Sequence, residues 1–266
     1  MIQRFNLFWI LLVVLAGCMP NPPRSTVPVT GPAPTFRKPT APLSKPKEVL
    51  ERAITARGGE ALLKKLLQVT YKGKGKSTPS NVVSSFDFIT ISALPHSIRD
   101  ESTYEDGTKF VQVLGKEKGW VSISGKVKEM DPAAVRAVRE QLYFNNLMTL
   151  VPLRDVAYTL EPLQEERKEG VMTQGFTVKC KDQQDLTLYF DKDTGLPMIA
   201  KTRVFDPNLL IDRDQETIFT RYAVMQGIQF PQRWVIYTDG NKAMELTFEE
   251  LTLHNKVDDI IFTRPQ

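Results

Sequence analysis

The sequence predicts a mainly β protein of the α+β class, in which one curved antiparallel sheet carries helices as a lid over its concave face. Short segments of strand character follow one another at hairpin spacing. Turn residues such as Asp191–Gly195 and Asp239–Gly240 separate them, where an α/β protein would have helices. Helical periodicity is confined to a few stretches. A sheet with so few helices either packs on a second sheet or curls, and a single curled sheet is the simpler solution.

Residues 1–17 have the pattern of a secretory signal peptide. Arg4 precedes an unbroken apolar run from Leu7 to Leu15, which is shorter than the about 20 residues of a membrane-spanning helix. The run ends in Leu15-Ala16-Gly17-Cys18, which resembles the bacterial lipobox, where the cysteine is acylated and the chain is cut before it. We therefore expect lipidation of Cys18, with acyl chains such as palmitate holding the protein on a membrane. An ordinary signal peptide or a membrane anchor is the alternative.

A proline-rich linker is predicted for residues 18–44, and the folded domain for residues 45–266. Nine of the 18 prolines lie between Met19 and Pro46, and such a sequence favours extended polyproline II at about 3.1 Å per residue. The segment is either a spacer between bilayer and domain or a leader without a spacing role. With Cys18 acylated, Cys180 has no partner for an intramolecular disulfide, so we expect the fold to depend on its core.

Three helical segments are predicted within the domain. The first has Ser44 as its cap and Pro46 in its first turn, and it ends at Gly58-Gly59. The second covers Glu60 to Leu67. The third opens at Asp131-Pro132, a cap residue followed by proline, and continues toward Leu147.

Twelve strands are predicted in two groups, one before and one after the Pro132 helix. The first group comprises Val69–Gly75, Val82–Ile91, His96–Tyr104, Lys109–Leu114 and Gly119–Ser124. The second comprises Val156–Leu160, Met172–Cys180, Asp185–Phe190, Pro197–Phe205, Thr217–Gln226, Gln232–Thr238 and Lys242–His254.

Four segments of the domain resemble, in order and spacing, the bacterial LolA/LolB-like superfamily of lipoprotein-sorting proteins. They are Arg52–Leu66, Tyr189–Asp206, Gly227–Leu251 and Val257–Pro265. The resemblance implies an incomplete β-barrel whose concave apolar face is covered by helices and holds acyl chains. It also implies a cell-envelope protein, lipid-anchored at the outer membrane and facing the periplasm. Met19 after the lipobox is compatible with outer-membrane delivery, and an acylated Cys18 favours the anchored members over a soluble carrier.

Two sets of residues are candidates for ligand and membrane contact. Trp120, Phe176, Tyr189 and Trp234 fall on strands with alternating apolar patterns, so we expect them to line the groove or the core. Leu209, Leu210 and Ile211 lie between turn and charged residues, and they are predicted to form an exposed apolar loop that contacts membrane or cargo. The alternative for this loop is a strand end tucked into the core.

Nucleic-acid, nucleotide and metal sites are disfavoured by composition and spacing. A net charge of +4 is too small for a nucleic-acid-binding protein of 266 residues. The run Gly73-Lys74-Gly75-Lys76-Ser77 lacks the first glycine of a phosphate loop, and Lys72, Lys74 and Lys76 instead suggest a sheet edge guarded by lysine. His96 and His254 have no partners at metal-ligand or nucleophile spacing, so no metal or cofactor is expected.

The sequence thus favours a non-catalytic envelope lipoprotein that binds lipid or the acyl chains of lipoproteins in transport or sorting. Its expected partners are the membrane, through Cys18, the bound acyl chains and an envelope protein. An anchored periplasmic protein-interaction or sensor module on the same fold is the alternative. A hydrolase is less favoured, because no nucleophile motif is present.

Overall fold

The computed structural model describes residues 42–78 and 83–266. The predicted signal peptide, Cys18 and nearly all of the predicted linker lie outside the described residues, so these remain predictions. Every helix, strand and core cluster reported below lies within residues 42–266.

One antiparallel sheet of 14 strands forms most of the described part of the protein. The helices are α1 (Pro46–Ala56), α2 (Glu60–Leu63) and α3 (Pro132–Leu147), with 3-10 turns η1 (Lys64–Leu67), η3 (Val151–Arg154) and η4 (Asp259–Phe262). The first strands are β1 (Gln68–Ser77), β2 (Ser84–Ala93), β3 (Ser97–Tyr104), β4 (Lys109–Leu114), β5 (Gly119–Ile123) and β6 (Lys126–Glu129). After α3 come β7 (Thr159–Pro162), β8 (Glu166–Lys168), β9 (Val171–Lys179), β10 (Leu186–Asp191), β11 (Pro197–Asp206), β12 (Ile211–Met225), β13 (Ile228–Thr238) and β14 (Asn241–Leu253).

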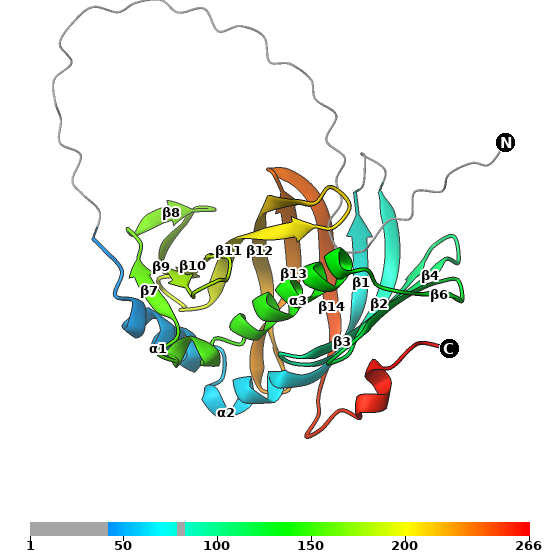
Figure 1. Ribbon diagram of the computed structural model, residues 1–266. Helices are drawn as coiled ribbons and strands as arrows, with labels where there is room; N and C mark the ends of the chain where they lie inside the picture. Colours follow the sequence, from blue (N-terminus) through cyan, green and yellow to red (C-terminus); the bar gives the residue numbers. More distant parts are fainter. Residues whose placement is uncertain (1–41, 79–82) are drawn as a thin grey trace, which may run out of the picture.

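The sheet curls but does not close into a barrel. Its strand order is β6-β5-β4-β3-β2-β1-β14-β13-β12-β11-β10-β9-β7, with β8 paired to β9. The first and last strands, β1 and β14, therefore pair in the middle of the sheet, and within the described chain the edge strands β6 and β7 are not paired to each other. Helix α3 connects these two edges and crosses the concave side of the sheet (Figure 1). The predicted curved sheet with a helical lid is confirmed.

The glycine- and lysine-rich segment of β1 is a central strand, not a phosphate loop. A Cβ on Gly73 would lie 2.0 Å from the carbonyl oxygen of Thr247, and one on Gly75 would lie 2.0 Å from the ring of Phe86. Only glycine therefore fits where the neighbouring strand and ring approach so closely. The prediction of a sheet edge guarded by lysine is wrong, because β14 and β2 flank β1 on both sides.

The predicted N-terminal cap of α3 is confirmed, whereas that of α1 is not. Asp131 caps α3, since its Oδ1 accepts a 2.8 Å hydrogen bond from the backbone N–H of Ala134. Ser44 does not cap α1: its Oγ accepts a 2.8 Å hydrogen bond from the N–H of Gly175 in β9. Lys45 takes the N-cap position without a side-chain cap. Ser44 thus ties the start of the domain to the sheet.

The strand boundaries differ from the predicted ones where local sequence lacks apolar alternation. Strand β12 starts at Ile211, six residues before the predicted Thr217, and its first part is rich in charged residues. Val156, predicted to start a strand, is fully exposed ahead of β7. The short strands β6 and β8 were not predicted, because each carries mostly charged residues.

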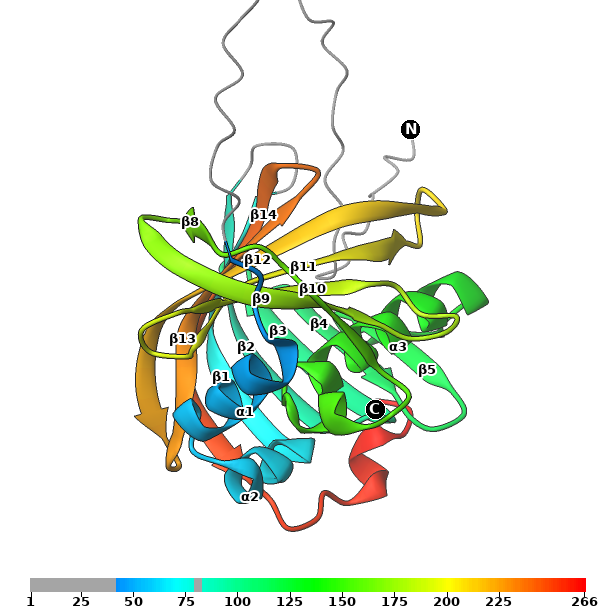
Figure 2. The same ribbon diagram turned by 90° about the vertical axis from the view of Figure 1, so that its left-hand side faces the viewer.

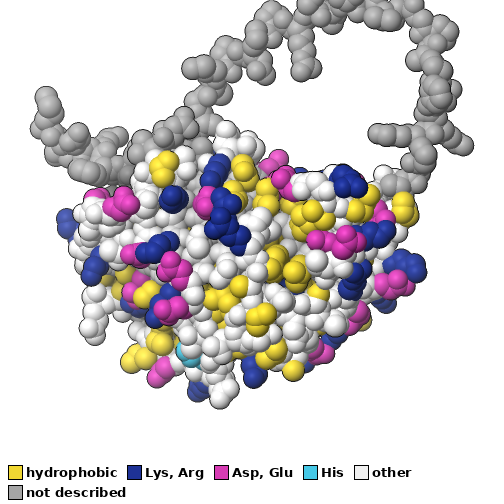
Figure 3. Space-filling model, turned by 180° about the vertical axis from the view of Figure 1, so that it is seen from behind, with side chains coloured by type: hydrophobic (Ala, Val, Ile, Leu, Met, Phe, Trp, Pro, Cys, Tyr) yellow, Lys and Arg dark blue, Asp and Glu magenta, His cyan; other side chains and the backbone are white. Residues whose placement is uncertain are grey.

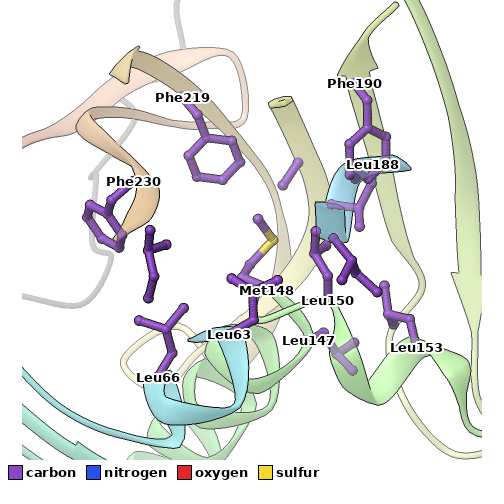
Figure 4. Packing of buried hydrophobic residues seen from close by; sticks show 14 of the residues in the cluster. Leu63, Leu66, Leu147, Met148, Leu150, Leu153, Leu188, Phe190, Phe219 and Phe230 are labelled. Atoms are coloured by element: carbon purple, nitrogen blue, oxygen red, sulfur yellow. The ribbon is translucent and has the colours of Figure 1, made fainter. Parts of the chain in front are cut away.

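The main core lies between the helices and the concave face of the sheet. Helices α1 and α2 stand in front of β1–β3 in the view of Figure 2. Figure 4 shows Leu63 and Met148 between strands that carry Phe219 and Phe230 and others that carry Leu188 and Phe190. Burying each such side chain contributes about 1.5–3 kcal/mol to folding.

Two smaller clusters complete the packing. One holds α3 on β3–β5, where Val138 and Leu142 pack with Ile98 and Leu114. The other joins Val257 and Phe262 of the C-terminal segment to Val113 of β4. The sheet is thus covered on its concave face by α3 and on the opposite face of β4 by the C-terminal segment.

Candidate functional site

A cavity of about 210 Å³ lies between the concave face of the sheet and the helices. For comparison, an engineered apolar protein cavity of about 150 Å³ binds benzene. Its walls come from β1–β4 on one side, β11–β14 on the other, and α3 with the residues that follow α1 and α3. The cavity thus lies between elements that the curled sheet brings together, and it is partly open to solvent.

One wall of the cavity is apolar and rich in aromatic rings. The ring of Trp234 lies 5.0 Å from that of Phe248 and 5.2 Å from that of Phe219, centroid to centroid. Phe230 lies 5.3 Å from Phe248, and Tyr71 stacks on Phe230 at 5.4 Å. Aliphatic residues of β13 and β14 extend this wall. Such a surface fits a hydrocarbon chain or a ring and offers it few hydrogen-bonding groups.

The opposite wall contains a polar row among its aromatic residues, because three neighbouring strands each place a polar residue at matching positions. Thr90 of β2 pairs with Asp100 of β3, and Asp100 pairs with Gln112 of β4. The Thr90 hydroxyl donates a 2.6 Å hydrogen bond to Oδ1 of Asp100. Ser92 and Ser102 flank this row, and all five residues line the cavity.

The carboxylate of Asp100 is buried in this wall. Burial raises the pKa of Asp100 to about 6, while hydrogen bonds from Thr90 and Gln112 oppose the rise. Its second oxygen, Oδ2, is shielded from solvent and has no hydrogen-bond partner among the described residues. Helix α3 faces the wall with Gln141 and Asn145, one turn apart, and Oε1 of Gln141 also lacks a partner within the described chain.

A buried arginine lies on another part of the cavity lining. Arg57, the residue after α1, is 4% exposed, and it donates hydrogen bonds to the carbonyl oxygens of Met148 at 2.6 Å and of Gln229 at 3.5 Å. Burial lowers the pKa of Arg57, and the nearby hydroxyls of Tyr71 and Tyr222 oppose that effect. Arg57 therefore links the end of α1 to the end of α3 and to β13.

Solved structures with the same arrangement of sheet and helices include a LolA superfamily protein from Nitrosomonas europaea. It aligns with 85% of this chain and 98% of its own length, at a TM-score of 0.51 and 12% sequence identity. A DUF1329 family protein from Desulfovibrio piger aligns with 82% of this chain and 96% of its own, at a TM-score of 0.52 and 14% identity. The fold is LolA-like. No protein-family model matches the chain, and no curated protein sequence matches it.

In this LolA-like fold, one of the four aromatic residues predicted for the groove lines the cavity. Trp234 does so, as part of the aromatic wall. The other three lie elsewhere: Phe176 is fully buried in the main core, which was the alternative expected from the sequence, and Trp120 packs with the C-terminal cluster. The ammonium group of Lys168 lies over the ring of Tyr189, with its Nζ 4.4 Å from the ring centroid. Strand alternation separates two faces but does not identify which face is concave.

The predicted apolar loop is exposed. Leu209, Leu210 and Ile211 are 43%, 65% and 50% exposed, so the alternative of a strand end tucked into the core is wrong. The turn is held from below by buried Asp206, whose Oδ1 accepts hydrogen bonds from the N–H groups of Asn208 and Leu209 at 3.0 and 3.2 Å. The role of this loop at a membrane remains a prediction.

Asp206 belongs to a buried ionic group at the base of that loop. Arg213 contacts Oδ2 of Asp206 at 3.4 Å and donates to Oδ2 of Asp239 at 2.8 Å. Arg213 and Asp206 are both almost fully buried. The group joins the start of β12 to the β13–β14 turn, and it fixes the base of the exposed loop.

The histidines and Cys180 do not belong to a recognisable catalytic or metal site in the described residues. His254 Nε2 lies 2.8 Å from the Thr70 hydroxyl, His96 is exposed, and Cys180 is a free thiol in the described chain. Within residues 42–78 and 83–266, no three His, Cys, Asp or Glu side chains are grouped as metal ligands. No helix in these ranges is long and apolar enough to cross a membrane.

Sequence reasoning missed the polar row of Thr90, Asp100 and Gln112. All three lie in segments that were correctly predicted as strands. Asp100 and Ser102, at alternate positions between Ile98 and Tyr104 of β3, are a signal for a polar strip inside the sheet. The strip becomes visible only when the register aligns the three strands.

Proposed function

We propose that the protein binds lipid, or the acyl chains of lipoproteins, in its cavity, without catalysis, as part of lipid or lipoprotein transport or sorting in the cell envelope. The observation that carries the proposal is the aromatic and aliphatic wall of a cavity between an open sheet and its helices. Removing apolar surface from water stabilises a bound chain by about 25 cal/mol per Å². The LolA-like fold supports the same conclusion.

The proposal includes an anchor at the membrane and a point of contact with it. An acylated Cys18, reached through the proline-rich linker, would hold the domain at the outer membrane facing the periplasm. The exposed Leu209–Ile211 loop supports a role in handing a bound chain to a bilayer, because three adjacent apolar side chains are held outward. Charged side chains of both signs are intermixed over the face shown in Figure 3.

Movement of the helices would widen access to the cavity, which is partly open to solvent. Arg154 of η3 forms ion pairs with Glu51 of α1 and Glu60 of α2. Exposed pairs of this kind contribute about 0–1 kcal/mol each, so they align the helices without locking them. Rearrangement of the helical lid, whose α3 lines the cavity with Gln141, Phe144 and Asn145, would control entry and release of the chain.

Native mass spectrometry of residues 42–266, purified without detergent, tests the proposal. We expect a co-purifying lipid or acylated peptide, identified after extraction. Leu246→Glu places a charge on the apolar wall and should abolish the bound mass. Val224→Glu is the matched control, since Val224 is 66% exposed and lies outside the cavity.

Two results would contradict acyl-chain binding. One is a protein at its unliganded mass that also fails to bind fluorescent fatty-acid probes. The other is equal loading of the wild type and Leu246→Glu. Either outcome would favour the alternative, an anchored interaction or sensor module that works through its protein surface.

A further inference from the structure

The cavity combines two chemically different halves in one space. The side formed by β12–β14 holds Phe219, Trp234 and Phe248, whereas the side formed by β2–β4 carries a polar row that includes Thr90 and Asp100, bordered by aromatic residues of the same strands. A pure hydrocarbon gains nothing from the polar half, because buried polar groups are stable only when they are hydrogen-bonded. The arrangement therefore suits an amphiphile, with its chain on one wall and its head on the other.

The polar half has a surplus of hydrogen-bond acceptors. Oδ2 of Asp100 and Oε1 of Gln141 are both shielded from solvent and unpaired in the described part of the chain. They come from facing elements, β3 and α3, and both residues line the cavity. Natural proteins leave few such atoms unpaired, so their presence on the walls of one cavity indicates a missing donor.

The missing donor also has to balance a negative charge. Asp100 forms no ion pair within the described residues, and its hydrogen-bond donors there, Thr90 and Gln112, are both uncharged. Arg57 does not serve as its counterion: the guanidinium donates to Met148 and Gln229, and the charges that affect its pKa are those of Tyr222 and Tyr71. A buried carboxylate without a cation is costly, and a cationic ligand would remove that cost.

We infer that the cavity ligand carries an ammonium head group, which donates hydrogen bonds to Asp100 and Gln141 while its apolar chain lies on the aromatic wall. An ammonium group has three donors and one positive charge, so it supplies both unpaired acceptors and the missing counterion. A hydroxyl head supplies one donor and no charge, and a carboxylate head would repel Asp100. The inference rests on the proposed function, since it assumes that the apolar chain binds in this cavity.

Isothermal titration of residues 42–266 with two ligands of equal chain length, dodecylamine and dodecanol, tests the inference at pH 7.5. For the wild type we expect dodecylamine to bind at least about tenfold more tightly than dodecanol, because a charged hydrogen-bonded pair forms only with the amine. Asp100→Asn should remove this preference and leave dodecanol binding within about twofold of the wild type. Gln141→Leu should weaken amine binding several-fold.

Asp87→Asn is the matched control, because it removes the same charge from the neighbouring strand β2. Asp87 is exposed and paired with Lys74, outside the cavity lining. We expect this variant to keep the wild-type preference for the amine. Circular dichroism and thermal unfolding of each variant show that it is folded at the temperature of the titration.

The outcomes separate the inference from the proposed function. Equal binding of amine and alcohol, or an amine preference that survives in Asp100→Asn, overturns the ammonium assignment and leaves acyl-chain binding standing. A loss of preference in Asp87→Asn also overturns it, because the effect would then come from overall charge. Failure of both ligands to bind the wild type contradicts the proposed function itself.

Discussion

Asp100 is expected to make the unliganded protein less stable at neutral pH than at mildly acidic pH. Burial raises the pKa of Asp100 from 3.8 to about 6, so between these values the folded state binds a proton that the unfolded state has released. Stability from this group is therefore present at low pH and is lost as the pH rises through 6. The loss reaches about 3 kcal/mol for a shift of about two pH units, at about 1.4 kcal/mol per unit.

Urea unfolding of the wild type and Asp100→Asn at a series of pH values measures this effect. Asp100→Asn should be the more stable protein at pH 7.5, and its advantage should shrink as the pH falls toward 4. The exposed Asp87→Asn should track the wild type across the range. An Asp100→Asn protein that is less stable than the wild type at pH 7.5 would contradict the assignment of Asp100 as an uncompensated carboxylate. Residues that bind a ligand often lower the stability of the unliganded protein.

Helix α3 depends on a single side chain for its first turn. The carboxylate of Asp131 accepts the N–H of Ala134, and Pro132 follows it in the first helical position. Asp131→Ala should lower the free energy of unfolding by about 1 kcal/mol, because a helix N–H loses its partner. Asp131→Asn, which retains a capping oxygen, should lose much less. Equal losses in the two urea titrations would show that the cap contributes nothing.

The outcome for each element shows what local sequence can predict. Asp131-Pro132 marks a helix start by its own chemistry, and the prediction is confirmed. Ser44 has the same capping ability, but tertiary structure recruits it to Gly175 of β9, 131 residues away. The early part of β12 is stabilised by ion pairs of Arg213 with the buried Asp206 and the half-buried Asp239. No local sequence pattern predicts these pairs. Local signals therefore succeed where neighbours along the chain provide the partner.

The cavity is a property of the whole sheet, and this limits what the sequence predicts about it. Alternation places Trp234 and Tyr189 each on one face of its strand, but the direction of curvature decides that only Trp234 faces the cavity. Asp100 and Gln112 become neighbours through register, and Gln141 lines the same cavity because α3 crosses the concave side of the sheet. The fold class could be predicted from the spacing of the strands and from the family resemblance. The polar part of the cavity could not, because its residues come together only in the assembled sheet.

The exposed loop should give the domain a measurable affinity for bilayers even without an anchor. Leu209, Leu210 and Ile211 project from one end of β12, above the buried Asp206–Arg213 pair. Each side chain that enters the hydrocarbon contributes up to about 1.5–3 kcal/mol, and about 1.4 kcal/mol corresponds to a factor of ten in binding. Leu210→Asp should therefore reduce co-sedimentation of residues 42–266 with phosphatidylcholine vesicles by about tenfold or more.

Val224→Asp is the control for that measurement, because Val224 is equally exposed and lies near the opposite end of β12, about 40 Å of strand away. If the loop is the membrane contact, Val224→Asp binds vesicles like the wild type, and Leu210→Asp retains full occupancy of the cavity in native mass spectra. Equal losses in both variants would mean that general surface hydrophobicity, and not the loop, drives binding. The comparison separates contact with the bilayer from ligand binding, because the loop residues do not line the cavity.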